Sequence, residues 1–206
     1  MYARTMRHTL LLSMTLCLGA LLPVAQADAT AASAVKTPTV ASLSQAEAES
    51  LLFMREEEKL ARDVYLWFYQ LHADNIFQTI AQSEERHTSQ VKVLLDTYGL
   101  PDPAAATAPG VFQNQVLQEL YDKLIAMGSA SLKQALYVGG LIEEKDLRDI
   151  QSALASIDNR DIVTVYTNLM DGSKNHLRSF VSRIEEIDGT YEPQILSEEE
   201  FNAVVN

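Results

Sequence analysis

Cysteine is nearly absent from this sequence, which has one, Cys17, among 206 residues. A single thiol excludes a disulfide framework, a multi-thiolate zinc site and a Cys-x-x-Cys redox pair. Basic residues are also scarce, because 16 Lys and Arg face 28 Asp and Glu and give a formal net charge of −12. Nucleic-acid binders need clustered positive charge to displace phosphate counterions, so the sequence argues against a nucleic-acid partner. The 47% of apolar and 21% of charged residues are typical of a globular chain and not of a disordered one.

The first 27 residues have the features of a cleavable export signal. A positively charged start precedes an apolar stretch over residues 10–22, and Ala25-Gln26-Ala27 fits the small-x-small cleavage pattern. The alternative is a retained N-terminal membrane anchor, although the apolar stretch is short for a span. Cleavage before Asp28 removes Cys17 and two positive charges, which takes the net charge from −12 to −14. We therefore expect an acidic, cysteine-free protein that is periplasmic or secreted and has no stable membrane span.

Helical periodicity governs the rest of the chain, after a flexible spacer over residues 28–42 that is rich in Ala, Thr and Ser. Ser44 and Glu47 form a capping-box pattern that predicts the first helix start. Apolar stripes, caps and breakers predict helices over about 44–71, 75–98, 114–127 and 132–157, and from a cap near 158–161 to about 187. No stretch alternates with a period of two between turn signals, so no sheet is expected. We predict an all-α four-helix bundle over residues 43–187, with a short extra helix in its central connection and an acidic C-terminal tail over 188–206.

Carboxylates and imidazoles interrupt the apolar stripes near the middle of four predicted helices. A lone carboxylate in such a stripe would more often lie at a helix end or reach water. Several together need either a cation or buried Arg and Lys side chains to neutralise them, and the inner stripes carry no base. A metal cluster is the simpler solution, and oxygen and nitrogen ligands without thiolates suit iron or manganese, and zinc less exclusively. The candidates are Glu58, Glu84, His87, His176, and either Glu143 or Glu144.

An internal repeat bears on the choice between Glu143 and Glu144. Residues 57–64 and 143–150 share the pattern Glu-Glu-Lys-x-x-Arg-Asp followed by Val or Ile, and the helix after each copy brings a histidine. Two helical hairpins related by pseudosymmetry would place these four helices around one centre. The repeat aligns Glu58 with Glu144, whereas apolar periodicity favours Glu143, which lies one heptad from apolar residues on both sides. We follow the repeat and predict Glu144 as the ligand.

The motif Glu58-x-x-Ala61-Arg62-x-x-Tyr65, followed by Glu84-x-x-His87, resembles the first hairpin of rubrerythrin and other ferritin-like di-iron proteins. Residues from about 43 to 187, with their Arg55–Asp63 opening and Gly172–His176 near the end, resemble an uncharacterised ferritin-like family of bacterial proteins.

This resemblance implies a ferritin-like four-helix bundle that holds two metal ions, with iron first and manganese or zinc as options. It implies that the protein binds Fe(II) and reacts with dioxygen or peroxide, as an oxidase or peroxidase. Glu84 would bridge the two ions and each histidine would hold one of them. The implied metal ligands are Glu58, Glu84, His87, Glu144 and His176.

The sequence departs from that family pattern at one position. Di-iron proteins repeat Glu-x-x-His on the second hairpin, but here Ser173 stands three residues before His176. Glu143, Asp146 or water are the candidates to replace the missing carboxylate, unless the site holds one metal well and a second poorly. The alternative function is a non-catalytic metal-binding or interaction module on the same bundle, and a homodimer is compatible with either function. The charged runs over residues 56–59 and 198–200 are of a kind that is mostly solvated.

Overall fold

The computed structural model describes residues 42–206, which form six helices and no strand. The predicted signal peptide and nearly all of the predicted spacer lie outside these residues. The all-α prediction is confirmed. Between residues 42 and 206, no helix has the length and the apolar character that a membrane span requires. The helices are α1 (Gln45–His72), α2 (Asn75–Tyr98), α3 (Gln115–Gly128), α4 (Leu132–Leu154), α5 (Arg160–Glu186) and α6 (Glu198–Val205).

Local sequence sets the helix ends close to their predicted positions. α1 begins at the Ser44 capping box, in which the Glu47 N–H donates to Ser44 Oγ (3.2 Å) and the Ser44 N–H donates to Glu47 Oε2 (2.9 Å). α2 is capped by Asp74 at its start and by Gly99 at its end, and the φ of 68° at Gly99 lies in the left-handed region that glycine adopts without steric penalty. α4 ends at Leu154, before the predicted end at residue 157.

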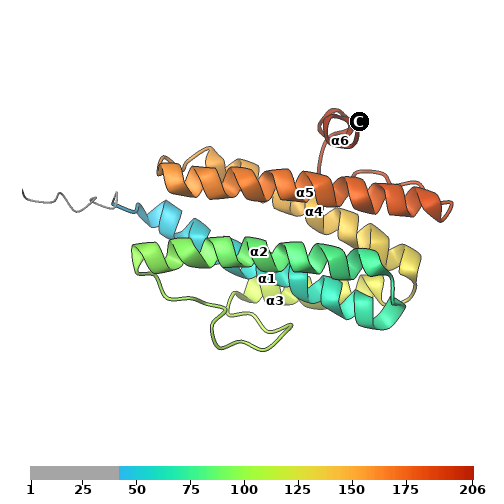
Figure 1. Ribbon diagram of the computed structural model, residues 1–206, viewed down its shortest axis with the longest axis horizontal. Coiled ribbons are helices and arrows are strands. Elements are labelled where there is room, and N and C mark those ends of the chain that lie inside the picture. The colour runs from blue at the N-terminus through green and yellow to red at the C-terminus, as the bar shows by residue number, and fades with distance from the viewer. Residues whose placement is uncertain (1–41) are drawn as a thin grey trace, which may run out of the picture. The chain divides into compact units, whose positions relative to one another are not determined.

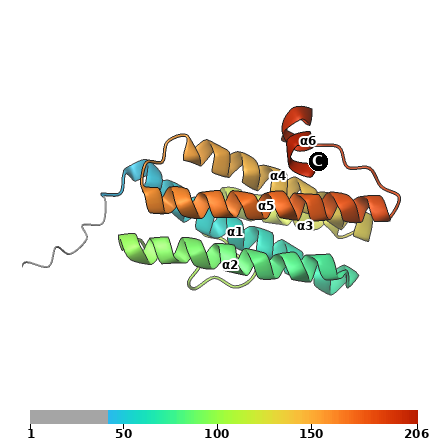
Figure 2. The same ribbon diagram turned by 45° about the horizontal axis from the view of Figure 1, so that its top comes forward.

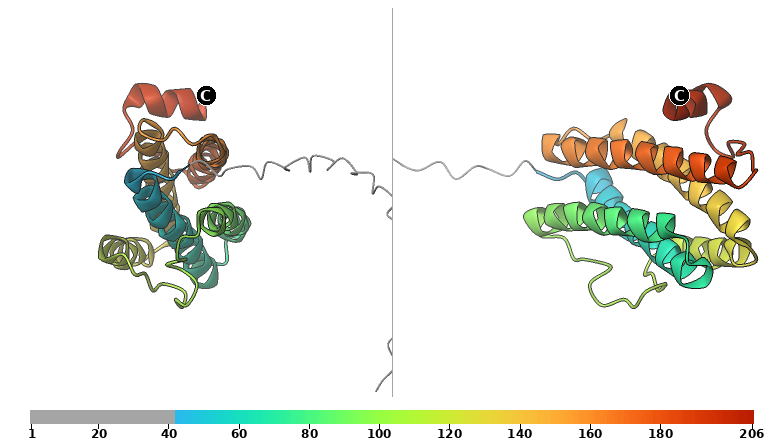
Figure 3. Two further views of the ribbon diagram at one scale, coloured as in Figure 1. Left: turned by 90° about the vertical axis from the view of Figure 1, so that its left-hand side faces the viewer. Right: turned by 45° about the vertical axis from the view of Figure 1, so that its right-hand side comes forward.

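The four long helices lie in two pairs, with α1 packed along α2 and α4 packed along α5 (Figure 1). The pairs meet where α2 contacts α5 and α1 contacts α4, so these helices surround one interior (Figure 3, left). α3 packs against both α1 and α4, and α6 lies across α5 (Figure 2). This bundle-like arrangement directs one face of each long helix toward the others.

The middle of α1 is buried on all sides, which the sequence interpretation of residues 56–59 as a solvated run did not anticipate. The connection between α2 and α3 covers the side of α1 that would otherwise face water. Glu56 accepts the backbone N–H groups of Gln113 (2.6 Å) and Asn114 (2.9 Å) in that connection. Lys59 donates to Asp63 (2.7 Å) and to two backbone carbonyls of the same connection. The buried charges of Glu56 and Lys59 therefore have partners, as burial of charge requires.

The apolar core consists of two clusters with a polar layer between them. One cluster holds Phe68, Phe77 and Phe180, and the other holds Leu51, Val91 and Ile162. On α1, α2 and α5, an acid or an imidazole lies between residues of the two clusters. On α4, Glu143 and Asp146 lie between two members of the larger cluster, at its edge toward Ile150 of the other cluster. The two clusters hold the helices in register on either side of this layer, so its side chains are placed by packing.

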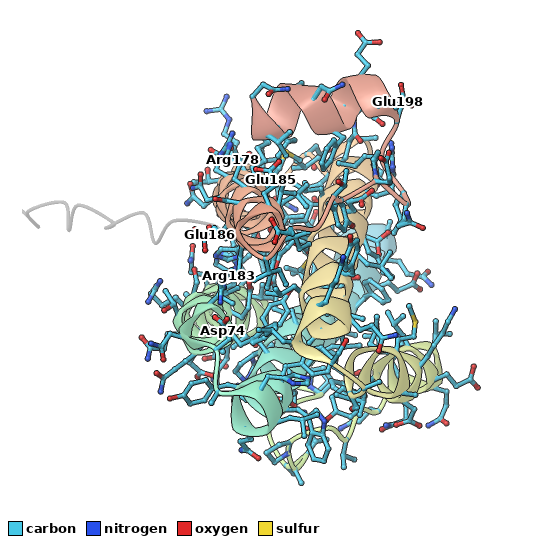
Figure 4. The ribbon with its side chains drawn as sticks, turned by 90° about the vertical axis from the view of Figure 1, so that its right-hand side faces the viewer. Asp74, Arg178, Arg183, Glu185, Glu186 and Glu198 are labelled. Carbon is cyan, nitrogen blue, oxygen red and sulfur yellow. The ribbon has the colours of Figure 1, made fainter. Side chains whose placement is uncertain are left out.

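Residues 188–206 pack against the bundle, and their interpretation as a weakly patterned tail is corrected. Tyr191, Leu196, Phe201 and Val204 are all buried in the larger apolar cluster. α6 begins at a capping box of Ser197 and Glu200 that the sequence interpretation missed. Arg178 of α5 donates to the carbonyl of Val204 (2.5 Å), while Glu198 points away from the bundle (Figure 4).

The far end of α5 is tied to the start of α2. Arg183 donates through Nε (2.9 Å) and Nη2 (2.8 Å) to Oδ2 of Asp74, the residue that caps α2 (Figure 4). The charge of Asp74 also lies at the positive end of the α2 dipole, where an acid is favourable. This contact fixes α5 against the α1–α2 pair at the end of the bundle.

Candidate metal centre

Four of the five predicted ligands converge in the polar layer. Glu58 comes from α1, Glu84 and His87 from α2, and His176 from α5, and the exposed fraction of each is 7% or less. The layer contains two groups of three residues, and within each group the ligand atoms all lie within 4.8 Å of one another. The first group is Glu58, Glu84 and His87, and the second is Glu84, Glu143 and His176. Glu84 therefore belongs to both groups.

Glu84 lies between the two imidazoles and presents one oxygen to each. Its Oε2 is 2.8 Å from Nδ1 of His87, and its Oε1 is 2.7 Å from Nδ1 of His176. On the outer sides, Glu58 Oε2 lies 3.3 Å from Nδ1 of His87 and Glu143 Oε2 lies 3.4 Å from Nδ1 of His176. The imidazole rings are stacked with centroids 5.4 Å apart. The centre is thus a symmetric row of two acid–imidazole groups that share one carboxylate.

Several ligand atoms in this row approach each other closely without hydrogen bonding. Glu84 Oε1 and His176 Nδ1 are 2.7 Å apart, yet neither has a hydrogen-bond partner of acceptable angle in the described chain. Glu58 Oε1 and Asp146 Oδ1 are likewise buried without a partner. Buried polar atoms are normally satisfied, and exceptions need an explanation. Carboxylate and imidazole ligand atoms that crowd one space without well-angled hydrogen bonds have the arrangement that a shared cation would satisfy.

Glu144 is not part of this cluster, and its selection as a ligand is corrected. Its carboxylate points to the C-terminal segment, where it accepts the Tyr191 hydroxyl (2.5 Å) and the backbone N–H groups of Gln194, Ile195 and Leu196. Glu143 takes the place beside His176. Adjacent residues on a helix point about 100° apart, so only one of them can face the interior. Apolar periodicity identified the residue that faces the cluster, whereas the repeat pointed to its neighbour.

Asp146 lies one turn after Glu143 and is held by Ser173. The Ser173 hydroxyl donates to Asp146 Oδ2, and the other oxygen of Asp146 has no hydrogen-bond partner among residues 42–206. Asp146 is close enough to Glu58 and Glu143 that their charges help to raise its pKa. Of the replacements weighed for the carboxylate absent at position 173, Asp146 is the one that Ser173 contacts.

The alternative neutralisation by buried bases does not fit the structure. Arg55 is buried, but its guanidinium pairs with Asp102 (3.0 Å) in the connection between α2 and α3. Lys59 pairs with Asp63, and Lys145 pairs with Glu57 (2.8 Å) and Asp149. In the part of the chain that the structure describes, no Arg or Lys nitrogen lies within ion-pair distance of the cluster acids. Four carboxylates (Glu58, Glu84, Glu143 and Asp146) would balance two divalent cations with both imidazoles neutral.

The acids and imidazoles of the cluster perturb one another's protonation. Burial raises the pKa of Glu58 to about 8 and raises the pKa of Asp146 well above its ordinary value. Burial disfavours the charge of Glu84, but contacts with His176 and His87 outweigh burial and lower its pKa to about 2. Burial disfavours the imidazolium of His87, yet contacts with Glu58 and Glu84 raise its pKa to about 11. The cluster therefore retains protons at neutral pH that a bound cation would have to displace.

Two neighbouring residues fix the orientation of the candidate ligands. Tyr65, which lies two turns after Glu58 on α1, donates its hydroxyl to Glu143 Oε1 (2.5 Å). Gly172 of α5 lies against the His87 ring, and a Cβ at this position would be 2.5 Å from Cε1 and Nε2 of that ring. The absence of a side chain at position 172 is therefore what leaves room for His87.

Comparisons with known proteins place this chain in one family. Residues 47–206 match the family described as "Uncharacterized protein domain (DUF2202)", a range that includes the C-terminal segment. The "Uncharacterized protein MJ0754" of Methanocaldococcus jannaschii is 45% identical over 164 residues, which are 80% of this chain and 89% of that protein. The crystal structure of hypothetical protein MJ0754 from Methanococcus jannaschii has a TM-score of 0.78 and covers 80% of this chain and 94% of that chain. The chain belongs to the DUF2202 family.

Proposed function

We propose that this protein is a ferritin-like di-metal carboxylate protein whose polar layer binds two divalent cations, with iron first and manganese or zinc as alternatives. The observation that carries the proposal is Glu84, which offers one oxygen to each of two groups and approaches both imidazoles at 2.7–2.8 Å. Two helical pairs that each contribute acids and one imidazole support the ferritin-like assignment. Oxygen and nitrogen ligands without thiolates favour iron or manganese.

The chain offers a separate ligand set for each ion. Glu58 and His87 would hold one ion, Glu143 and His176 would hold the other, and Glu84 would bridge them. Asp146 would supply the further carboxylate, with its free oxygen available and its other oxygen fixed by Ser173. Groups that orient a ligand are as important to a metal site as the ligand itself. Tyr65 has this role toward Glu143.

The proposed reaction is oxidation of Fe(II) by dioxygen or reduction of peroxide. When bound, ferrous ions supply the electrons for that chemistry. The chain excludes bulk water from the cluster, because all of its acids and imidazoles are buried. The Tyr65 hydroxyl donates a hydrogen bond to Glu143 Oε1, and burial raises the pKa of Tyr65 well above its ordinary value, so the hydroxyl keeps its proton at neutral pH.

Metal content and ferrous oxidation test the proposal directly. The purified protein should hold about two metal ions per chain and should produce ferric absorbance when Fe(II) is added in air. Glu84→Ala should lose the metal, whereas Glu85→Ala should keep it, because the neighbouring Glu85 side chain is 58% exposed and pairs with Arg62. Metal content below about one ion per chain, together with a Glu84→Ala variant that is no less stable than the wild type, would contradict the proposal.

The second candidate function is a non-catalytic metal-binding module, and Ser173 is the observation that favours it. Serine replaces the carboxylate expected three residues before His176, which reduces the ligands available to one ion. Bound metal without ferric absorbance or peroxide consumption would select this function.

We also propose that the protein is exported, on the basis of residues 1–27, which lie outside the described residues. Cell fractionation and N-terminal sequencing test this, with Asp28 as the expected first residue. A mature chain that still begins at Met1 would contradict it.

A further inference from the structure

A cavity of about 180 Å³ lies against the candidate metal centre. Glu58, Glu84, Glu143 and Asp146 form part of its wall, and most of the remaining wall is aliphatic. The aliphatic side chains come from α1, α3, α4 and the segment before α6, and include Leu60, Leu124, Ile142 and Ile195. The surface of the cavity is therefore mostly apolar, and its polar part comes from the acids of the centre, Glu57 and two lysines.

The cavity and the imidazoles lie on different sides of the acids. His87 and His176 contact the acids through Nδ1, but neither ring lines the cavity. A cation held by the acids and imidazoles would thus have protein nitrogen on one side and the cavity on the other. A catalytic metal site needs such an open side, because protein ligands fill all positions of a purely structural site.

The size and the lining of the cavity indicate what it can hold. An apolar cavity of about 150 Å³ binds benzene and stays dry, and one water occupies only about 30 Å³ of liquid. The cavity is therefore larger than dioxygen or peroxide requires, and its aliphatic walls offer peroxide few hydrogen-bond partners. Of the two lysines in the wall, Lys145 is already paired with Glu57 and Asp149, and Lys123 is exposed on α3.

We propose that this cavity is a binding site for a neutral, apolar organic molecule of about benzene's size, held beside the carboxylates of the centre. The inference deepens the proposed function, on which its catalytic meaning rests, by naming the class of molecule that reaches the centre. Entry is beside α3, where the wall contains the half-buried Leu120 and the exposed Lys123.

Benzene binding to the protein as purified tests the inference. Benzene should give a saturable rise in Tm and a saturation-transfer NMR signal, since a ligand that binds only the folded state stabilises it. Ala61→Leu places three more carbon atoms in the cavity wall and should weaken binding by about tenfold or more. Ala153→Leu is the matched control, because Ala153 packs against the other apolar cluster. Leu120→Ala should admit naphthalene, which the wild type should exclude.

The outcomes separate this inference from the proposed function when metal content is measured on the same samples. Bound metal with no saturable benzene binding overturns the inference alone. Benzene binding without bound metal supports the cavity and overturns the proposed function. If Ala61→Leu fails to fold, Leu141→Phe fills the same cavity from a half-buried position on α4. Benzene binding that neither filling variant weakens also overturns the inference.

Discussion

The glutamates at positions 143 and 144 are adjacent and both buried, yet the structure assigns them opposite consequences on substitution. Glu143 faces the cluster, where it lies 3.4 Å from His176 Nδ1. Glu144 faces away and accepts the Tyr191 hydroxyl (2.5 Å) and the N–H groups of Ile195 (2.7 Å) and Leu196 (2.8 Å). Replacing each with glutamine changes one oxygen to an amide nitrogen with little change in volume.

We predict that Glu144→Gln destabilises the protein and leaves metal content unchanged. A hydrogen bond to a charged group contributes about 1.5–3 kcal/mol, and the amide weakens several of them at once. A loss of about 3 kcal/mol would lower Tm by about 6–12 °C in a chain of this length. Thermal unfolding of the metal-free protein measures this effect without any contribution from bound metal.

Glu143→Gln should have the reverse profile. No Arg or Lys pairs with Glu143 in the described residues, and burial raises its pKa, so loss of its charge should cost the metal-free protein little stability. The substitution also removes a proposed ligand, so metal content should fall from about two ions per chain to about one. Loss of metal in Glu144→Gln together with full metal in Glu143→Gln would refute the assignment. It would also restore the repeat as the correct guide to the ligand.

Three further predictions concern residues around the centre and at the ends of the bundle. Gly172→Ala should reduce metal content while α-helix content by circular dichroism stays unchanged, because the new Cβ would displace the His87 ring. Gly189→Ala is the control, because it crowds a glycine that does not contact His87. Gly110→Ala is unsuitable as a control, since the φ of 75° at Gly110 is strained for alanine. Burial disfavours the charge of Glu47, but hydrogen bonds from Ser44, Asn159 and Asp158 outweigh burial and lower its pKa from 4.5 to about 2. The stability that the ionised Glu47 contributes is present above pH 4.5 and is lost as pH falls toward 2. Glu47→Gln should therefore lower the free energy of unfolding in urea by about 3 kcal/mol at pH 7 and by almost nothing near pH 2. Equal losses at both pH values would contradict this prediction. Truncation after residue 187 should lower Tm and expose apolar surface to a hydrophobic dye, because it removes the buried Tyr191 and Phe201, whereas a solvated tail would leave both readouts unchanged.

Much of the helical architecture follows from short-range sequence features. The Ser44 capping box, the Asp74 cap and Gly99 set the ends of α1 and α2 close to where the sequence predicted them. These signals act within a few residues of the chain, so no knowledge of the tertiary fold is needed to interpret them. The capping box of Ser197 and Glu200 was equally local, and attention to it would have revealed α6.

Charge patterns were a poorer guide, because their meaning depends on what covers them. The run over residues 56–59 has the composition of a solvated surface, yet the connection between α2 and α3 covers it and supplies partners for Glu56 and Lys59. A segment more than 40 residues away in the chain makes that environment, so no local pattern could reveal it.

Periodicity, caps and breakers are enough to predict that the chain is helical, where most helices begin and end, and that acids and imidazoles occur at mid-helix on four of them. Which of these side chains meet depends on how the helices pack against one another. Glu143 and Glu144 differ by one step around α4, and the choice between them depends on how that helix is rotated between the bundle interior and the C-terminal segment. Asp146 joins the cluster because Ser173 of α5 lies opposite it. Helix rotation and helix pairing result from packing across the whole core, and the periodicity of a single segment constrains them only in part.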